Sequence, residues 1–508
     1  MTFRSILFPQ DATPLQATEA PAFFADLNLD QIVDAITAPK QEYALTSYFY
    51  TPLLDIDSIY YRHEVMKDLE DASLLEQIQH FAQQMRTIRK QLEQVEKLYY
   101  TLQKQRWFLS AVDVYCAAVA RLTDALGSAP LRSRGFVAFR EYLNAYTDSD
   151  GFQMLLRDTK ALIDDLASIQ YTMLVYDSSV KVRQCDSEAD YSFEVTQTFA
   201  KFQQGSVKDY TVKFTEWPDL SQLEATVLEF VSKLFPDIFA RLAAYCTANQ
   251  HYIDATIRSF DREIQFYVGY LEYVSPLQRG GLSVCYPRVS VTKEVYADDS
   301  FDIALAHKLI QGQSAVVCND FYLRGKERVF VVSGPNQGGK TTFARTFGQL
   351  HYLALIGCPV PGRDAQLFLF DKLFTHFEKE ETLTSLHGKL EDELFRIHDI
   401  LENATPRSIV IMNEIFTSTT LRDAIFLARR VMEAIVHLDL LCVFVTFIDE
   451  MASLSDTIVS AVSTTVPDNP ALRTFKVIRR PADGRAYAVT IAEKYRLTYE
   501  CLKERIQV

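Results

Sequence analysis

A glycine-rich run between an apolar segment and a helical one is the part of the sequence best equipped for chemistry. Residues 329–342 read VFVVSGPNQGGKTT, and Gly334, Gly339, Lys340 and Thr341 fit the phosphate-binding pattern G-x-x-x-x-G-K-[ST]. The glycines let backbone N–H groups turn towards phosphate oxygens, and the helix that follows adds its positive N-terminal end. The plain alternative is a glycine-rich turn with a chance lysine. The strand before the run and the apolar helix after it favour phosphate binding.

Each position of this loop has a predicted role in holding a nucleoside triphosphate. We expect Lys340 to neutralise the β- and γ-phosphates, and we expect the hydroxyl of Thr341 to hold Mg²⁺. The predicted ligands are therefore ATP and Mg²⁺. The residues predicted to bind them form one unbroken run: Gly334, Pro335, Asn336, Gln337, Gly338, Gly339, Lys340, Thr341 and Thr342.

A second apolar run ends in two polar residues that could act on the same triphosphate. Residues 408–412, SIVIM, predict a buried strand that is followed by Asn413 and Glu414. A carboxylate at this place can orient or activate a water near the γ-phosphate, so Glu414 and Lys340 are the predicted catalytic residues. An amide one position earlier can hold Mg²⁺ through its water shell. Asn413 and Thr341 are therefore the predicted metal residues.

The second half of the chain is predicted to be an α/β domain built on parallel strands. Apolar runs at 328–333, 408–412 and 440–446 predict its buried strands. Residues 474–487 and 488–492 predict an antiparallel pair at the edge of the same sheet. Helical spacing predicts four helices, at 343–356, 389–403, 421–436 and 497–506.

The first half of the chain is predicted to be mostly helical. Apolar residues at spacings of three and four predict one long amphipathic helix over 73–109. Residues 219–273 predict further helix, divided at Pro236. Before them, apolar and polar residues alternate and predict a small β insert at about 175–217. The predicted domains are a lead-in at 1–40, a helical domain at 41–284, and an ATPase domain with its connecting seam at 285–508.

Composition limits the class of protein and its partners. The chain has 508 residues, a mean hydropathy of -0.04 and eight cysteines without a C-x-x-C pair, which favours a folded protein in a reducing compartment. It has no basic-then-apolar leader and no apolar run longer than 440–448, so we expect a cytoplasmic protein with no membrane partner. Its 66 acidic and 52 basic residues give a net charge of -14. Nucleic-acid binding would therefore need a local basic face.

The phosphate loop also resembles that of a known family. Residues 334–341, GPNQGGKT, are similar to the loop of the MutS mismatch-repair ATPases, in which Pro-Asn after the first glycine is distinctive. The resemblance is strong over 316–451 and looser elsewhere. Five further segments carry it: YTPLLDIDSIYYRHEVMKDL at 50–69, the run at 316–323, IGCPVPG at 356–362, LENAT at 401–405 and IVIMNEIFTSTT at 409–420.

The resemblance implies a multidomain α + α/β fold class. A helical MutS-like core and lever domain would be followed by an ABC-like P-loop ATPase domain. It also implies a homodimer that forms through the ATPase domain around two nucleotides. Thr419, Thr420 and Asp423 would lie in the turn that faces the opposite subunit, and the insert at 175–217 would match the clamp that closes on DNA.

The chain departs from the pattern of that family at both ends and inside the ATPase. The helical core begins near residue 40, so we expect no mismatch-recognition or connector domain, and residues 214–216 match the Phe-x-Glu mismatch reader only by chance. We expect no C-terminal dimerisation extension. Four ATPase positions differ in residue type: Asn413 replaces an aspartate, Gly388 a serine, Phe447 a histidine and Val316 an adenine-stacking aromatic.

Two functions stay open on the sequence alone. The first is a dimeric, nucleoid-associated clamp that binds DNA structures in repair or recombination, does not recognise mismatches, and hydrolyses ATP slowly and in response to DNA. The second is a nucleotide-gated scaffold or regulator that acts on a protein partner without DNA. A small-molecule kinase is disfavoured because the helical half shows no acceptor pocket. A salt-sensitive DNA affinity would separate the first two.

Overall fold

The protein is α-rich and multidomain, with mixed sheets. The computed structural model describes residues 3–9, 17–176, 179–185, 194, 197–198, 220–378, 388–466, 469–482 and 496–506. Contacts divide the chain into unit 1, with residues 1–3, 68–132 and 136–261, and unit 2, with residues 4–67, 133–135 and 262–508. Residues 4–67 and 262–284 thus belong to unit 2, which also contains the phosphate loop. The three-domain division at residues 40 and 284 stays a prediction.

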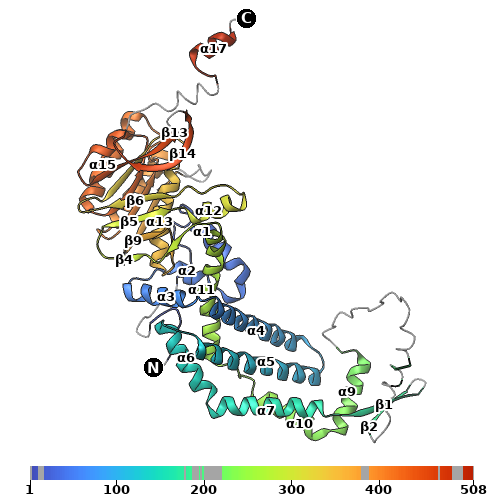
Figure 1. The fold of residues 1–508 in the computed structure, drawn as a ribbon. Helices are drawn as coiled ribbons and strands as arrows, with labels where there is room; N and C mark the ends of the chain where they lie inside the picture. Colours follow the sequence, from blue (N-terminus) through green and yellow to red (C-terminus); the bar gives the residue numbers. More distant parts are fainter. Residues whose placement is uncertain are drawn as a thin grey trace. The chain divides into compact units, whose positions relative to one another are not determined.

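The described residues of unit 1 are helical apart from one hairpin and the connecting turns (Figure 1). Pro236 begins a new helix, as the sequence predicts. The elements are α4 (Ala72–Lys97), α5 (Thr101–Ser128), most of α6 (Arg134–Thr147), α7 (Asp150–Ala167), β1 (Tyr171–Tyr176), β2 (Ser179–Gln184), α9 (Gln222–Leu234), α10 (Pro236–Ala248) and the first part of α11 (Ala255–Arg279).

The prediction of one helix over 73–109 is wrong. Asp71 caps α4 by accepting hydrogen bonds from the backbone N–H groups of Ser73 and Leu74. The backbone then becomes extended at Leu98, with φ −60° and ψ 148°, and α5 packs against α4. The periodicity was misleading because each helix carries its own apolar stripe, and the break between the two stripes leaves the spacing almost unchanged.

The small β insert is described only at its beginning. Strands β1 and β2 pair antiparallel, from Tyr171 opposite Gln184 to Tyr176 opposite Ser179. The hairpin therefore begins four residues before the predicted start of the insert. Most of the rest of the insert, including residues 214–216, lies outside the described residues.

A six-stranded sheet forms the centre of unit 2 (Figure 1). Its strand order is β10-β11-β12-β7-β13-β14, in which the first five strands are parallel and β14 runs antiparallel to β13. The strands are β7 (Val329–Ser333), β10 (Leu373–Phe377), β11 (Ile409–Asn413), β12 (Leu441–Val445), β13 (Ile458–Val466) and β14 (Asn469–Arg479).

The sheet confirms the three predicted parallel strands as β7, β11 and β12. The strand predicted at 474–487 overlaps β14, but its antiparallel partner is β13, which the sequence analysis did not predict. The partner predicted at 488–492 lies outside the described residues. Strand β13 escaped prediction because polar residues interrupt its apolar ones, as in its sequence IVSAVSTTV.

Helices cover both faces of the six-stranded sheet, which explains why its central strands β7, β11 and β12 are apolar along almost their whole length. On one face, Phe330 of β7 packs against Phe343 and Phe347 of α13 (Lys340–Leu355). The other face carries Val329 and Val331, which lie in one buried cluster with residues of α14 (Lys389–Asn403) and α15 (Leu421–Leu438). Alternate residues of one strand thus enter two separate cores.

Unit 2 contains further described elements. A four-stranded sheet of order β4-β9-β5-β6 and a β3–β8 pair join residues 284–300 and 319–323 to residues 360–368. No helix of the described ranges is long and apolar enough to cross a membrane. The elements are α1 (Leu29–Thr37), η1 (Ala38–Tyr43), α2 (Thr46–Tyr50), α3 (Ile56–Asp68), β3 (Val284–Cys285), β4 (Arg288–Ser290), β5 (Val295–Ser300), α12 (Ile303–Gln311), β6 (Asn319–Leu323), β8 (Val360–Pro361), β9 (Asp364–Phe368), η2 (Asp449–Ser453) and α17 (Tyr499–Ile506).

A fully buried arginine holds the C-terminal end of α13. Arg62 of α3 donates from Nη1 to the carbonyl of Ile356, at 2.7 Å, and from Nε to the carbonyl of Leu7, at 3.2 Å. Its guanidinium also lies 4.9 Å from the ring centroid of Phe8 and 4.8 Å from that of Phe266. A cation at this place satisfies carbonyls that a helix end leaves without partners.

We predict that Arg62→Met destabilises unit 2 by about 2–5 kcal/mol, because two buried carbonyls lose their donor while the side-chain volume is kept. The measurement is urea unfolding followed by far-UV circular dichroism. The control is Arg430→Met, which removes an exposed arginine paired with Glu433 and should change stability by less than about 0.5 kcal/mol. Equal unfolding midpoints for the two variants would contradict the assigned role of Arg62.

Candidate nucleotide-binding site

The phosphate loop connects the central strand of the sheet to a helix. Strand β7 is buried along its whole length and lies between β12 and β13. Residues 334–339 follow it, and α13 begins at Lys340 without a side-chain cap. The first N–H groups of α13 therefore stay available at the loop, where they can bind an anion.

Two glycines of the loop are required by lack of space. Gly334 has φ +115°, and a Cβ on it would lie 2.6 Å from Oγ of Ser463. A Cβ on Gly338 would lie 2.5 Å from the same Oγ and 2.9 Å from the carbonyl oxygen of Pro335. The hydroxyl of Ser463 is buried and has no hydrogen-bond partner among the described residues. The loop therefore packs on β13 too closely for side chains at these two positions.

The ammonium group of Lys340 is enclosed by oxygen atoms of the loop. The side chain is only 5% exposed, and its Nζ lies 3.5 Å from Oε1 of Glu414. Burial lowers the pKa of Lys340, while the carboxylate of Glu414 acts in the opposite direction. The hydrogen bonds of Nζ go to Gly334 O at 3.1 Å, Pro335 O at 3.4 Å and Asn336 Oδ1 at 3.1 Å.

The end of β11 brings Asn413 and Glu414 to the start of α13. Thr341 Oγ1 donates to Asn413 Oδ1 at 2.9 Å. Neighbouring oxygen ligands of an octahedral Mg²⁺, with bonds of about 2.1 Å, lie about 3 Å apart, so this oxygen pair fits Mg²⁺. Glu414 adopts φ +53°, and its N–H donates to Val445 O at 2.9 Å. The chain thus turns sharply there and directs Glu414 towards Lys340.

The structure gathers the predicted site residues in one place. The nine loop residues adjoin one another, and Lys340 and Thr341 contact Glu414 and Asn413 respectively. Asn336 and Gln337 form the exposed tip of the loop, where Gln337 has φ 58°. The roles assigned to these residues stay predictions.

The positions that depart from the MutS pattern lie at exposed or partly buried places. Gly388 precedes α14, and a Cβ on it would meet nothing within 4 Å, so packing does not require a glycine there. Lys389 Nζ pairs with Oε1 of Glu378 at 2.6 Å. Phe447 follows β12 and is 49% exposed, whereas Val316 is partly buried.

The turn predicted to face a second subunit has a local structural role. The hydroxyl of Thr420 accepts a hydrogen bond from the backbone N–H of Asp423 and donates one to its carboxylate. Thr420 is thus the N-cap of α15. This capping explains the Thr-x-x-Asp spacing without a partner subunit.

Among the described residues that contact the phosphate loop, sequence reasoning missed Ser463 and Arg473. Ser463 of β13 packs on Gly334 and Gly338, as described above. Arg473 of β14 donates from Nε to the carbonyl of Asn336, at 3.2 Å. Neither residue lies in a motif, and both come from the hairpin whose pairing was not predicted. Only the polar residues within an otherwise apolar C-terminal stretch could have pointed to them.

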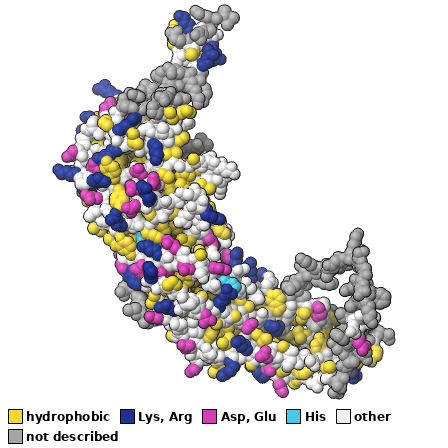
Figure 2. All heavy atoms as spheres, viewed as in Figure 1, with side chains coloured by type: hydrophobic (Ala, Val, Ile, Leu, Met, Phe, Trp, Pro, Cys, Tyr) yellow, Lys and Arg dark blue, Asp and Glu magenta, His cyan; other side chains and the backbone are white. Residues whose placement is uncertain are grey.

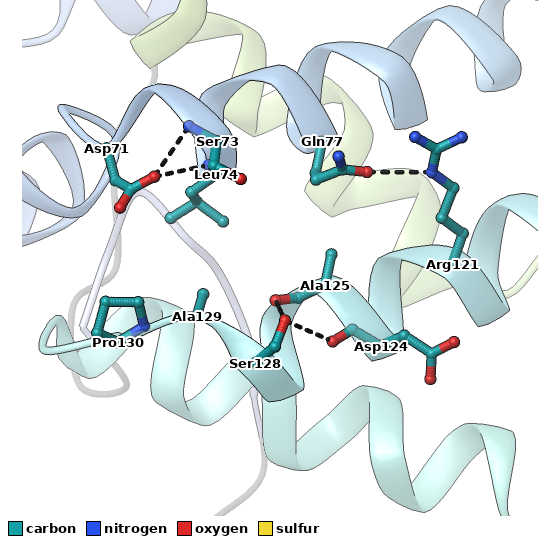
Figure 3. Close-up of a pocket in the computed structure, with 10 residues that line it drawn as sticks. All are labelled: Asp71, Ser73, Leu74, Gln77, Arg121, Asp124, Ala125, Ser128, Ala129 and Pro130. Carbon is teal, nitrogen blue, oxygen red and sulfur yellow. Dashed lines mark hydrogen bonds between the residues drawn. The ribbon is translucent and has the colours of Figure 1, made fainter.

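A separate pocket of about 460 Å³ lies in unit 1, between the start of α4 and the end of α5 (Figure 3). Asp71 is engaged there in capping α4, and Ser128 donates to the carbonyls of Asp124 and Ala125. Arg121 donates to Oε1 of Gln77. Because these polar groups serve helix ends and helix pairing, we assign no chemistry to this pocket.

We predict that Gly338→Ala weakens ATP binding at least about tenfold, because the added Cβ must displace the loop from Ser463 or from Pro335. Equilibrium titration with ATP measures the effect. Gly127→Ala is the control, since a Cβ on Gly127, in α5, meets nothing within 4 Å. The double variant Gly338→Ala/Ser463→Ala should recover part of the affinity. An unchanged affinity for Gly338→Ala would show that the loop does not need this close packing.

Comparison with known proteins adds the family. Residues 330–506 match MutS domain V. A DNA mismatch repair protein MutS of Thermosipho melanesiensis is 31% identical over 186 residues, which is 35% of this chain and 22% of the relative. The proteins of the same name from Shouchella clausii and Clostridium kluyveri are 29% and 25% identical, over 54% and 57% of this chain and 32% and 34% of their own lengths. The chain thus spans about a third or less of these relatives, and the matches support membership of the MutS family for the region that they cover.

Proposed function

We propose that this chain binds ATP and hydrolyses it slowly, as the ATPase part of a dimeric MutS-like clamp that binds DNA structures. The observation that carries the proposal is the convergence of Lys340, Thr341, Asn413 and Glu414 at the N-terminus of α13. These groups supply a buried cation, two neutral oxygens and a carboxylate beside open backbone N–H groups. That combination suits a triphosphate with its metal ion.

Lys340 would exchange its loop oxygens for phosphate oxygens when a nucleotide binds. Its present partners are two carbonyls, one amide oxygen and one carboxylate. They hold the ammonium group beside the place where the β- and γ-phosphates would lie. Phosphate oxygens carry more charge than carbonyls and make stronger hydrogen bonds with an ammonium group. The exchange is therefore favourable, and the lysine is already positioned for it.

Glu414 would act on the attacking water. The carboxylate is 29% exposed, so water can reach it, and it lies 3.5 Å from the lysine that would hold the γ-phosphate. A carboxylate there can accept a hydrogen bond from water and orient its oxygen for in-line attack. Thr341 and Asn413 would hold Mg²⁺, which when bound supplies positive charge to the phosphate oxygens. The neutral amide of Asn413 supports a slow rate, because it holds the metal less firmly than a carboxylate.

The proposal for DNA is drawn from the relatives, whose names describe DNA mismatch repair proteins. Unit 1, with its long helices, would act as the core and lever, and unit 2 would contain the ABC-like ATPase and its dimer interface. On the face visible in Figure 2, lysine and arginine side chains are interspersed with aspartate and glutamate. This mixture, together with the net charge of -14, favours a small local DNA contact over a broad basic surface.

We expect two substitutions at the site to have different effects. Lys340→Ala removes the buried cation and should weaken ATP binding at least about a hundredfold. Glu414→Gln keeps the shape of the side chain and should leave ATP affinity within about threefold, while turnover falls about a hundredfold or more. Titration with ATP and phosphate release measure the two quantities. Unchanged turnover in Glu414→Gln would remove Glu414 from the mechanism.

DNA dependence is expected to distinguish the clamp from the scaffold. ATP turnover should rise with one of branched, mismatched or plain duplex DNA, and the stimulation should fade as salt rises, because phosphate contacts release counterions. Phosphate release with each DNA, at low and moderate salt, measures this, and Glu414→Gln is the control for contaminating ATPases. ATP binding without any DNA response would favour the nucleotide-gated scaffold, which acts on a protein partner.

A further inference from the structure

A second cation lies at the phosphate loop and belongs to no recognised motif. Arg473 donates from Nε to the backbone carbonyl of Asn336, at 3.2 Å, and the side-chain oxygen of the same Asn336 accepts a hydrogen bond from Lys340 Nζ at 3.1 Å. One exposed loop residue is thus held between two positive side chains. The arginine approaches from β14, on the side of the loop opposite to β12 in the strand order.

The hairpin of β13 and β14 positions this arginine at the loop. Its register is irregular around Ser463, Thr465 and Val466, where Thr465 lies opposite Arg473. Such irregularities bend a strand and redirect its side chains. Phe475 has φ 58° at the same bend, and its carbonyl lies 3.4 Å from the position of a Cβ on Gly339.

Side chains outside the ladder hold the bent strand in place. Asn319 of β6 accepts a hydrogen bond from Val477 N at 2.7 Å and donates one to Phe475 O at 3.2 Å. The hydroxyl of Thr464 contacts the hydroxyl of Thr474. The bend is therefore fixed from both sides, and the strand carries Arg473 to the loop in a defined position.

Two positively charged side chains lie at the phosphate loop. Lys340 and Arg473 bring two positive charges, and Glu414 is the carboxylate that pairs with Lys340. Asn413 is neutral at the place where a carboxylate would balance a metal ion. A bound anion at the loop would be attracted by both positive charges.

We propose that Arg473 is a second phosphate-binding residue, which contacts the outer phosphates of a bound nucleoside triphosphate and makes ATP binding less dependent on Mg²⁺. The inference rests on the proposed function. The hydrogen bond to Asn336 orients the planar guanidinium at the loop, and a guanidinium can pair with two phosphate oxygens at once. Arg473 would thereby supply part of the positive charge that a metal ion held by a carboxylate brings to such a site.

The test is equilibrium binding of ATP and ADP to the full chain, with Mg²⁺ and with excess EDTA. The unmodified chain should lose less than about tenfold in ATP affinity in EDTA. Arg473→Gln should bind ATP about three- to tenfold less tightly with Mg²⁺ and at least about thirtyfold less tightly without it, because the charge of Arg473 then no longer substitutes for that of the metal. ADP affinity should change less, since the outermost phosphate is absent.

Two further variants make the result decisive. Arg473→Lys keeps the charge and should recover most of the ATP affinity in EDTA, which a loss of strand structure would not allow. Arg430→Gln removes an exposed arginine of α15 and should leave all affinities unchanged. If the unmodified chain binds ATP and Arg473→Gln has the same ATP affinity with and without Mg²⁺, the inference about Arg473 is wrong while the proposed function stands. If the unmodified chain binds no ATP, the proposed function fails and the inference with it.

Discussion

The buried ammonium group of Lys340 is the interaction on which the rest of the site depends. A charge withdrawn from water is costly unless it is paired, and here three loop oxygens and the carboxylate of Glu414 provide its partners. The open N-terminus of α13 and the nearby Arg473 add further positive potential. The loop thus encloses a cation. Phosphate oxygens would form stronger hydrogen bonds with this cation than its present partners do.

The surrounding structure keeps this cation in place by holding α13 at both ends. At the start of the helix, Gly334 and Gly338 pack directly on Ser463 of the neighbouring strand. At the other end, Arg62 donates to the carbonyl of Ile356 from within unit 2. Between them, the aromatic residues of α13 pack on β7. A shift of the helix would therefore break contacts in several elements at once, which holds the loop in its observed position.

The local parts of this site could be predicted from the sequence, and the distant ones could not. The phosphate loop and the pair Asn413–Glu414 each lie in one short segment, and the residue types of each segment indicate its chemistry. Arg473 reaches Asn336 over a sequence separation of 137 residues, through an irregular strand that no periodicity indicates. Arg62 looks like one more polar residue of an amphipathic helix until the packing is known. The break between α4 and α5 was missed because apolar spacing alone does not show where a helix turns back.

The most direct test of the central claim is a crystal structure of the full chain with Mg²⁺ and a non-hydrolysable ATP analogue. The account predicts that the triphosphate lies in the loop of residues 334–341, with Lys340 Nζ moved from the carbonyls of Gly334 and Pro335 onto phosphate oxygens. The Thr341 hydroxyl and the Asn413 amide oxygen should adjoin the metal ion. A structure in which Lys340 keeps its loop oxygens and Glu414, while the nucleotide lies elsewhere, would contradict the account.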